Sequence, residues 1–510
     1  MHQRHFIASF IVLLASLVSL SLDASASDAR AEATVDSAKP KVGSLVFEDC
    51  EYESHNRRRK VDCASLTVAE DYSEPTGKLI DIAIVRLRAA STQPQDDPVL
   101  MIAGGPGQGA IESFLFADKA LHKLARNRDI YLIDQRGTGH SSRQSCEIDP
   151  FSSIGVDSNS TEYFPRIREI LTECFAKLSG DARMYTTSAA IRDFENIRKA
   201  LDIQQWNLFG VSYGTRVEQH YMKVAPDAIR TAVLDSVVPL SSSLGPEIPA
   251  LSQKALDVFL SRCENEKACA KAYPSLRTDL HALFARLTKG PETVRFENLR
   301  SGEFETIDFT LDHLVSTIRM ALYNTKALSV LPPMLHEASA NSNFAPLARD
   351  AVKTLRAIND MLAFGMHNSV MCTEDYPFYA LSDGDRQAMA ASYMGDQIVD
   401  LMEIACSIWP QGQIDKDFKV PLKSTIPVLL LSGSDDPITP PKYAEQVKIG
   451  LKNSKHFVLS GQGHSVSFTA CTPTIIAKFI DEGHLDNIND NCLKRLKAAP
   501  LFIDFNGPDA

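Results

Sequence analysis

The sequence lacks the features that mark several specialised classes of protein. It has no internal repeat and no low-complexity tract, and its one sizeable basic run is Arg57–Lys60. The formal net charge of −11 is unfavourable for binding a phosphate backbone, which relies on basic side chains. The 510 residues, 44% apolar and 23% charged, are ordinary for a globular chain of one large or two to three smaller domains. Nucleic acid is therefore not expected as a partner.

Metal-binding patterns are also missing. No C-x-x-C occurs and the 13 His residues are scattered, so neither a metal site nor a cofactor is predicted. The 10 cysteines form an even set, which indicates disulfides and an oxidising compartment. Our hypothesis is pairing between neighbours in sequence, although spacing alone favours only the two short loops, 50–63 and 263–269. The full hypothetical set is 50–63, 146–174, 263–269, 372–406 and 471–492.

The amino terminus has the three parts of an export signal. Arg4 is followed by the apolar run Phe6–Leu22 and by the small residues Ala24-Ser25-Ala26. We predict a signal peptide over 1–26, cleaved after Ala26, and a flexible lead-in over 27–44. An uncleaved membrane anchor is the alternative, because the apolar run is close to the lower length limit of a bilayer span. Cleavage would leave an exported chain, periplasmic or extracellular, with no stable membrane insertion.

Short apolar runs then alternate with helical patterns. A helix capped by Ser188 would place Ile191, Phe194, Ile197 and Leu201 on one face. Strands alternating with helices predict an α/β fold with a mostly parallel sheet covered on both faces. The predicted strands are 80–87, 98–103, 129–133, 206–211, 231–238, 427–431 and 456–459.

The alternation stops near Pro239 and resumes near Pro427, and the residues between are mainly helical in pattern. We therefore predict a core over 45–239 and 426–510, split by a helical cap over 240–425. Open α/β sheets carry their sites at the carboxyl ends of strands, so a cap there would cover the site. The alternative is an independent second domain elsewhere on the surface.

One motif predicts a nucleophile. Gly210-Val211-Ser212-Tyr213-Gly214 follows a predicted strand and precedes a helical pattern, the context that a nucleophile elbow requires. The turn is tight enough to need residues without bulk beside Ser212. The alternative is a small-residue turn that happens to contain serine. We predict Ser212 as the nucleophile.

A serine nucleophile needs a histidine base and a carboxylate that orients it, and in this fold the order along the chain is Ser, acid, His. Two strand ends supply them. Gly433-Ser434-Asp435-Asp436-Pro437 follows one predicted strand, and Gly461-Gln462-Gly463-His464 follows the next. His464 is the predicted base. Asp436 is the preferred acid because of its spacing from Gly433, and the adjacent Asp435 remains the alternative.

Acyl transfer also needs backbone N–H donors for the oxyanion. The amide of Tyr213 is one expected donor, and the second is expected from Gly104 or Gly105, in the loop after the strand 98–103. A phosphate-binding loop is the competing interpretation, but neither the dinucleotide spacing nor the Walker spacing with its Lys is present.

These motifs together resemble the prolyl-iminopeptidase and tripeptidyl-aminopeptidase group of α/β-hydrolase serine peptidases, and in particular its secreted tripeptidyl-aminopeptidase branch. The resemblance spans roughly Val99 to Phe479. In one departure, Ala103 stands where the family usually has His in H-G-G-P-G. The run Asp134–Ser141, which has the pattern D-Q-R-G-x-G-x-S, is specific to the group and is expected to form a turn pinned by Arg136, with direct substrate contact as the alternative. The remaining shared motifs are Gly104-Gly105-Pro106-Gly107, Trp206–Arg216, Asp436–Pro440 and Gly463-His464.

The resemblance implies peptide substrates from whose N-terminus residues are removed. Such an enzyme needs an acid for the substrate ammonium, and Met371-Cys372-Thr373-Glu374-Asp375 resembles the family segment that supplies one. Glu374 is the candidate and Asp375 the alternate, while an ordinary solvated carboxylate is the other interpretation. The same triad would serve an esterase or lipase, and a binding protein on the same scaffold is the third class.

Overall fold

A nine-stranded sheet runs through the centre of the computed structural model, which describes residues 41–54, 57–146, 160–299 and 301–508. The strand order is β13-β12-β9-β8-β6-β7-β5-β4-β3. The six strands from β13 to β7 in this order run parallel, while β5, β4 and β3 are antiparallel to their neighbours. The bounds are β3 Glu48–Ser54, β4 Arg57–Ala69, β5 Leu79–Leu87, β6 Val99–Ile102, β7 Ile130–Ile133, β8 Trp206–Val211, β9 Ile229–Asp235, β12 Val428–Gly433 and β13 Ser454–Leu459.

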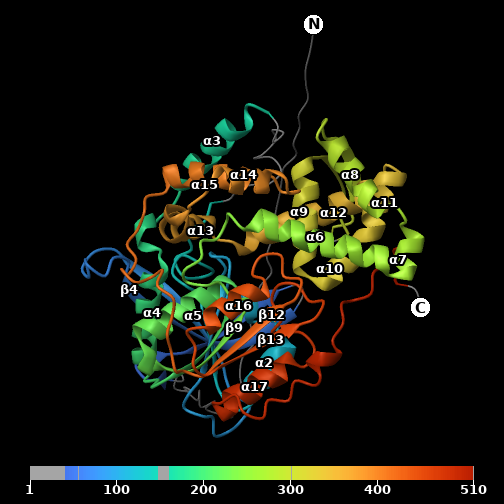
Figure 1. Cartoon of the computed structure of the whole chain (residues 1–510). Coiled ribbons are helices and arrows are strands. Elements are labelled where there is room, and N and C mark those ends of the chain that lie inside the picture. Colours follow the sequence, from blue (N-terminus) through green and yellow to red (C-terminus); the bar gives the residue numbers. More distant parts are fainter. Residues whose placement is uncertain (1–40, 55–56, 147–159, 300, 509–510) are drawn as a thin grey trace, which may run out of the picture. The chain divides into compact units, whose positions relative to one another are not determined.

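Helices cover both faces of the sheet, as predicted. Successive strand residues point to opposite faces, so Leu100 and Leu208 join one buried apolar cluster and Met101 and Phe209 join another. Strands buried on both faces explain the continuous apolar runs in the sequence. Helices α4 (Thr187–Ala200), α5 (Tyr213–Val224) and α16 (Pro441–Lys448) lie on one face, and α1 (Ala110–Phe114), α2 (Asp118–Leu124) and α17 (Thr472–Glu482) on the other (Figure 1).

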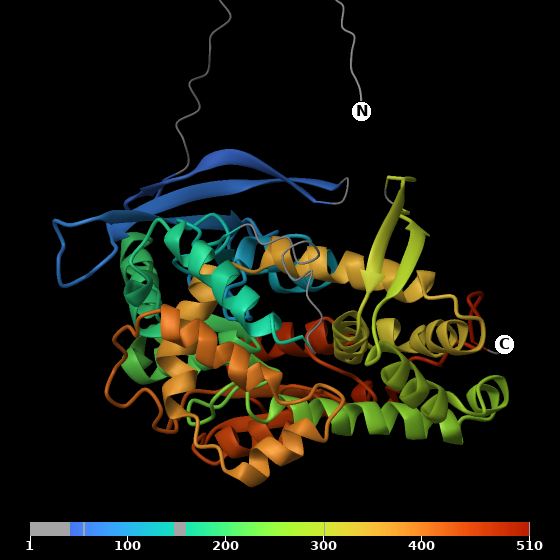
Figure 2. The same cartoon turned by 90° about the horizontal axis from the view of Figure 1, so that it is seen from above.

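The seven predicted strands are present with small shifts of their ends, but the sequence analysis missed the hairpin of β3 and β4. This hairpin lies at the edge of the sheet (Figure 2), where half of its side chains face solvent. Its many charged residues obscure the apolar alternation on which a strand prediction depends.

The predicted flexible lead-in also differs at its end. Strand β1 (Lys41–Val42) pairs with β2 (Leu45–Val46), and the N–H of Ser44 donates to the carbonyl of Ala200 at 2.7 Å. Residues 41–44 therefore belong to the folded unit. The predicted signal peptide over 1–26 and the rest of the lead-in, 27–40, lie outside the described residues.

The segment between β9 and β12 holds most of the remaining helices and one hairpin, β10 (Glu292–Glu297) with β11 (Phe304–Phe309). Helices α6 to α12 pack around an apolar cluster of their own. The helices of the whole segment are α6 Ile248–Asn265, α7 Lys267–Ala272, α8 Leu276–Leu287, α9 Leu311–Tyr323, α10 Thr325–Ser329, α11 Leu331–Ala340, α12 Ala345–Met361, α13 Phe364–Val370, α14 Asp383–Ala390 and α15 Gln397–Ile408.

A helix from outside this segment adds to it. Helix α3 (Tyr163–Ala176), which the sequence analysis assigned to the first part of the core, packs against α15 through Tyr163, Ile167 and Ile404 (Figure 1). The layer of helices that includes α13 to α15 is therefore built from two separate stretches of chain.

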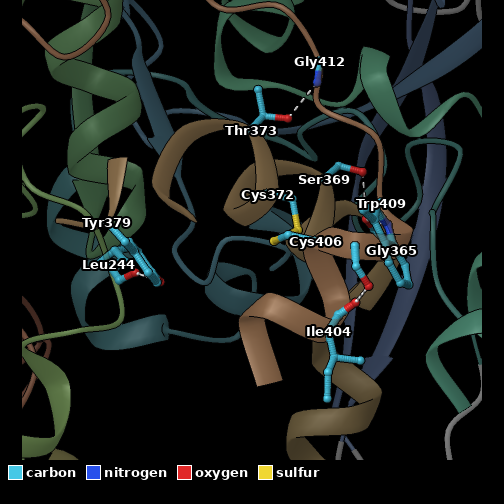
Figure 3. The surroundings of a disulfide bond; sticks show 11 residues. Leu244, Gly365, Ser369, Cys372, Thr373, Tyr379, Ile404, Cys406, Trp409 and Gly412 are labelled. Carbon is cyan, nitrogen blue, oxygen red and sulfur yellow. Dashed lines mark hydrogen bonds between the residues drawn. A yellow bond between two sulfur atoms is a disulfide. The ribbon is translucent and has the colours of Figure 1, made fainter. Parts of the chain in front are cut away.

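All five disulfides join neighbouring cysteines in the sequence, so the hypothetical pairing is confirmed. The Cys372–Cys406 bond joins the π-helical turn η3 (Met371–Asp375) to α15 (Figure 3). Around it, Trp409 donates its indole N–H to the carbonyl of Gly365 at 3.2 Å. This corner of the fold is thus held by both a covalent bond and a buried hydrogen bond.

The helix that contains Ile191 begins earlier than predicted. Thr186, not Ser188, is the N-cap of α4, and its side chain accepts the N–H of Ala189. Ser188 lies inside the first turn, where its hydroxyl bonds Asp415 at 3.0 Å. The apolar face was correct, because Ile191, Phe194, Ile197 and Leu201 are all buried.

Candidate active site

Ser212 lies in the turn between β8 and α5. Its backbone has φ 57° and ψ −124°, a conformation that L-residues rarely adopt and that costs on the order of 1–3 kcal/mol. A Cβ on Gly210 would lie 2.7 Å from a carboxylate oxygen of Glu218, and one on Gly214 would lie 2.5 Å from the carbonyl of Ile102. Both glycines are therefore needed for the close packing of the elbow, and the half-buried Ser212 is presented at the end of β8.

The loop after β12 brings Asp436 to His464. A carboxylate oxygen of Asp436 lies 2.8 Å from Nδ1 of His464. The same carboxylate accepts the backbone N–H groups of Ile438 and Thr439 at 2.9 and 2.8 Å, and the Thr439 hydroxyl at 2.8 Å. Asp435 instead accepts a hydrogen bond from Ser434 and is partly exposed. The structure therefore brings Asp436, and not Asp435, to the histidine.

The charges of this pair reinforce each other. Burial alone would raise the pKa of Asp436, but the neighbouring His464 and the donors from residues 438 and 439 hold it below its ordinary value. Burial opposes protonation of His464, yet the carboxylate of Asp436 outweighs it and raises the pKa of the imidazole. The pair is thus arranged to stabilise an imidazolium, the form a general base takes during catalysis.

The residue that links the two loops was not predicted from the sequence. Asp235, at the end of β9, accepts the N–H of Ser212 with its carbonyl oxygen at 2.9 Å. Its buried carboxylate accepts the N–H groups of Val466 and Ser467 at 3.1 and 2.8 Å, and also the Ser467 hydroxyl. The serine turn and the histidine loop are therefore held by one residue. Its only signal in the sequence is an acidic residue at the end of an apolar strand.

The predicted oxyanion loop passes close to the serine. A Cβ on Gly104 would lie 3.0 Å from the Cβ of Ser212, so a side chain here would push the loop and the serine slightly apart. Gly105 is exposed and has φ +105°. The amide of Tyr213 is the first of α5 and so has no acceptor within the helix. Of the three predicted donors, Gly104 and Tyr213 therefore lie next to the serine, and Gly105 follows Gly104 in the same loop.

The segment between β9 and β12 also contacts the loop that contains Gly104 and Gly105. Nδ1 of His367, on α13, lies 2.9 Å from the carbonyl oxygen of Pro106, and the N–H of Ala363 donates to the carbonyl of Gly107 at 2.9 Å. Ala103, which replaces the family histidine, is buried at the end of β6. Contacts from α13 thus support the loop.

Arg136 has the structural role expected of it. Its buried guanidinium binds both carboxylate oxygens of Asp193 at 2.6 and 2.7 Å and donates to the carbonyls of Ala69, Glu70 and Met184. The run that begins at Asp134 is thereby fixed to α4 and to the end of β4.

Glu374 and Asp375 lie together on turn η3, and both are fully buried. Asp375 accepts Nη1 of Arg216 at 2.8 and 2.9 Å and lies 3.4 Å from Nζ of Lys419. Its charge is therefore compensated within the protein. Neither Arg216 nor Lys419 was predicted from the sequence as a partner. The two basic side chains bind Asp375 and not Glu374, so the two adjacent acids differ in whether their charge is paired.

Glu374 has only neutral donors. It accepts the N–H and hydroxyl of Thr187 at 2.7 and 2.8 Å, and burial raises its pKa to about 7. The Thr187 hydroxyl also lies 2.5 Å from the hydroxyl of Tyr213, the residue after the nucleophile. Glu374 is thus an acid without a basic side chain bonded to it, two hydrogen bonds from the serine turn.

The fold and the site define an α/β hydrolase. A profile of the alpha/beta hydrolase fold family matches residues 97–470, and the protein belongs to that family. Serine protease Hip1 of Mycobacterium tuberculosis (strain ATCC 25618 / H37Rv) is 25% identical over 475 residues, covering 84% of this chain and 87% of that protein. The tripeptidyl aminopeptidase of Streptomyces lividans is 30% identical over 222 residues, 40% of each chain.

Among solved structures, proline iminopeptidase from Mycobacterium smegmatis covers 82% of this chain and 98% of its own, with 14% identity and a TM-score of 0.40. The predicted fold class is confirmed, and the resemblance to the peptidase group is borne out by relatives named as peptidases. The chain is a serine hydrolase of the α/β fold.

Two further observations concern metals and membranes. Across the described residues, no three His, Cys, Asp or Glu side chains are grouped as metal ligands. Within the same ranges, no helix is both long and apolar enough to cross a bilayer. The five disulfides indicate a compartment outside the reducing cytoplasm.

Proposed function

We propose that the protein is an exported serine exopeptidase that removes residues or short peptides from the N-terminus of peptide substrates. The Ser212 oxygen attacks the scissile carbonyl carbon while His464 accepts the serine proton, and Asp436 stabilises the imidazolium. The amides of Tyr213 and of Gly104 or Gly105 hold the oxyanion.

Collapse of the tetrahedral intermediate breaks the C–N bond, and the imidazolium gives its proton to the leaving amine. Water then attacks the acyl-enzyme with His464 as base, which releases the N-terminal fragment and restores the serine hydroxyl. The triad alone does not specify the leaving group, so specificity has to come from residues around it.

The observation that carries the exopeptidase proposal is Glu374. An ammonium group that leaves water must meet a compensating charge, and Glu374 is a buried acid without a basic partner close to the serine turn. Asp375 is the weaker candidate because Arg216 and Lys419 already compensate its charge.

The test compares free and N-acetylated forms of the same aminoacyl and tripeptidyl arylamides. We expect the native enzyme to prefer the free amine by about tenfold or more, since a hydrogen-bonded charge pair contributes roughly 1.5–3 kcal/mol. Glu374→Gln should remove the preference while leaving turnover of acetylated substrates, and the exposed Glu303→Gln serves as the matched control. Equal preference in native enzyme and Glu374→Gln would contradict the role of Glu374.

The second candidate is a carboxylic-ester hydrolase, because the same triad cleaves esters. Turnover of short-chain aryl esters with no turnover of any arylamide or peptide would favour it. Failure of Ser212 to react with a fluorophosphonate would exclude both enzymes and favour a binding protein.

Export is tested at the amino terminus. We expect the mature chain, purified from the periplasm or the medium, to begin at Ser27. A mature chain that still begins at Met1 would favour the uncleaved anchor instead.

A further inference from the structure

Helix α9 ends against His464 of the candidate active site and carries an arginine one turn before that end. Tyr323, the last residue of α9, packs edge to face on His464 with ring centroids 5.1 Å apart. Its carbonyl oxygen accepts the backbone N–H of His464 at 2.9 Å. Arg319 precedes Tyr323 by four residues, so the two side chains share one face of the helix. Arg319 therefore lies on the side of the site formed by His464.

The charge of Arg319 also acts on a histidine that contacts the oxyanion loop. Burial lowers the pKa of His367, and the positive charge of Arg319 lowers it as well. His367 contacts the carbonyl of Pro106 within that loop.

The charge of Arg319 is not compensated within the described part of the chain, where no carboxylate forms an ion pair with it. Its Nε atom is buried without a hydrogen-bond partner. Its polar neighbours include the hydroxyls of Tyr323 and Tyr393; burial raises the pKa of each, and the charge of Arg319 opposes that rise. By contrast, the fully buried Arg136 and Arg216 each bind an aspartate. Arg319 is only half-buried, so its guanidinium, which has no carboxylate partner among the described residues, is available to bind an anion.

We propose that Arg319 binds a carboxylate on the leaving-group side of the substrate. This rests on the proposed peptidase function, in which His464 protonates the leaving amine and so marks that side. Glu374, linked through Thr187 to Tyr213, and Arg319, one helical turn before the tyrosine that packs on His464, then have opposite charges that match the two ends of a short peptide. The carboxylate is either the C-terminus of a short substrate or an Asp or Glu side chain just after the scissile bond. A guanidinium binds either one with paired hydrogen bonds.

The test uses the full-length mature enzyme and peptides that differ only in the leaving part. One pair has a free or an amidated C-terminus after a single leaving residue, and the same pair is made with six leaving residues. A second pair, made at both lengths, has Asp or Asn directly after the scissile bond. Arylamides, whose leaving group carries no carboxylate, measure the activity of the triad without the contact to Arg319. The variants are Arg319→Met and Arg319→Lys, with the exposed Lys326→Met as control.

We expect Arg319→Met to lower kcat/KM at least about tenfold for the carboxylate substrates, mainly through KM, and to leave arylamide turnover within about twofold. Arg319→Lys should retain part of the preference, and Lys326→Met all of it. If Arg319→Met lowers kcat/KM only for the short peptides with a free C-terminus, and not for their amidated forms, the bound group is the C-terminal carboxylate. If Arg319→Met lowers kcat/KM for the Asp peptides and not for the Asn peptides at both lengths, the bound group is the Asp side chain.

Two results would overturn the proposal. If the native enzyme cleaves peptides but does not distinguish carboxylate from amide, the role of Arg319 is wrong and the peptidase function stands. If the native enzyme cleaves esters but no peptide or arylamide, the peptidase function is wrong and this proposal fails with it.

Discussion

The N–H of Ser212 donates a 2.9 Å hydrogen bond to the carbonyl oxygen of Asp235, whose carboxylate in turn holds the amides of Val466 and Ser467. One residue at the end of β9 therefore sets both the strained serine turn and the loop that carries His464. The distance between nucleophile and base depends on this residue, although it would touch no substrate in the proposed mechanism.

We expect Asp235→Asn to lower kcat/KM and to move the acid limb of its pH profile to lower pH. The carboxylate of Asp235 contributes to raising the pKa of His464, so removal of its charge makes the imidazole easier to deprotonate. A profile measured with an uncharged arylamide checks this. The exposed Asp486→Asn is the control, and a fall in activity with an unchanged profile would mean that the aspartate acts through packing alone.

The two adjacent acids after β12 should behave very differently. Asp436→Asn is expected to lower kcat by about 10⁴-fold, because the imidazole loses the acceptor that sets its tautomer and stabilises its charge. Asp435→Asn should remain within about threefold of the native enzyme, since that carboxylate contacts Ser434 and not the histidine. Steady-state kinetics of the two variants decide between them, and the reverse order would return Asp435 to the triad.

The preference for a free amino terminus should depend on pH in a way that identifies Glu374. Burial raises the pKa of Glu374 to about 7, so the carboxylate is lost as the pH falls through that value. Peptide amino groups lose their charge above a pH of about 8. The ratio of kcat/KM for free over acetylated substrate should therefore peak between these values. The titration of His464 affects both substrates equally and so cancels in this ratio. A ratio that stays constant from pH 5 to 9 would contradict an ion pair between Glu374 and the substrate ammonium.

Removing the Cys372–Cys406 bond should destabilise the protein more than removing Cys263–Cys269. The first closes a 34-residue separation and the second a 6-residue separation, for which chain entropy gives about 4 and about 2 kcal/mol. Double Cys→Ala variants measured by denaturant unfolding check the order. The 372–406 variant should also lose preference for free amines, because turn η3 carries Glu374. Equal loss of stability would contradict the chain-entropy account.

Much of the site could be predicted locally. Ser212 was identifiable because the elbow imposes its own residue types, small at 210 and 214, on a strand followed by a helix. The parallel strands were identifiable because burial on both faces leaves continuous apolar runs. Sequential disulfide pairing was correct because each pair joins segments that are close in the chain and in the fold.

The errors had local causes as well. Ser188 was a plausible cap, but Thr186 starts the helix two residues earlier, and one polar residue cannot be told from another without the backbone. The β3–β4 hairpin was missed because its exposed edge is charged. Helix α3 joined the insertion only through packing on α15, a contact that no sequence period encodes.

The amino-acid order alone was sufficient for the fold class and for the candidates Ser212 and His464, because each depends on short-range geometry or on a period of two or about four residues. The full set of cysteine pairs was a hypothesis from the sequence, and the structure confirmed it. The choice of Asp436 over Asp435, the role of Asp235 and the difference between Glu374 and Asp375 needed the folded chain. Each of these depends on which charge or N–H group, often more than 100 residues away, meets a carboxylate within hydrogen-bond distance. Such partners are brought together by packing and have no local signature.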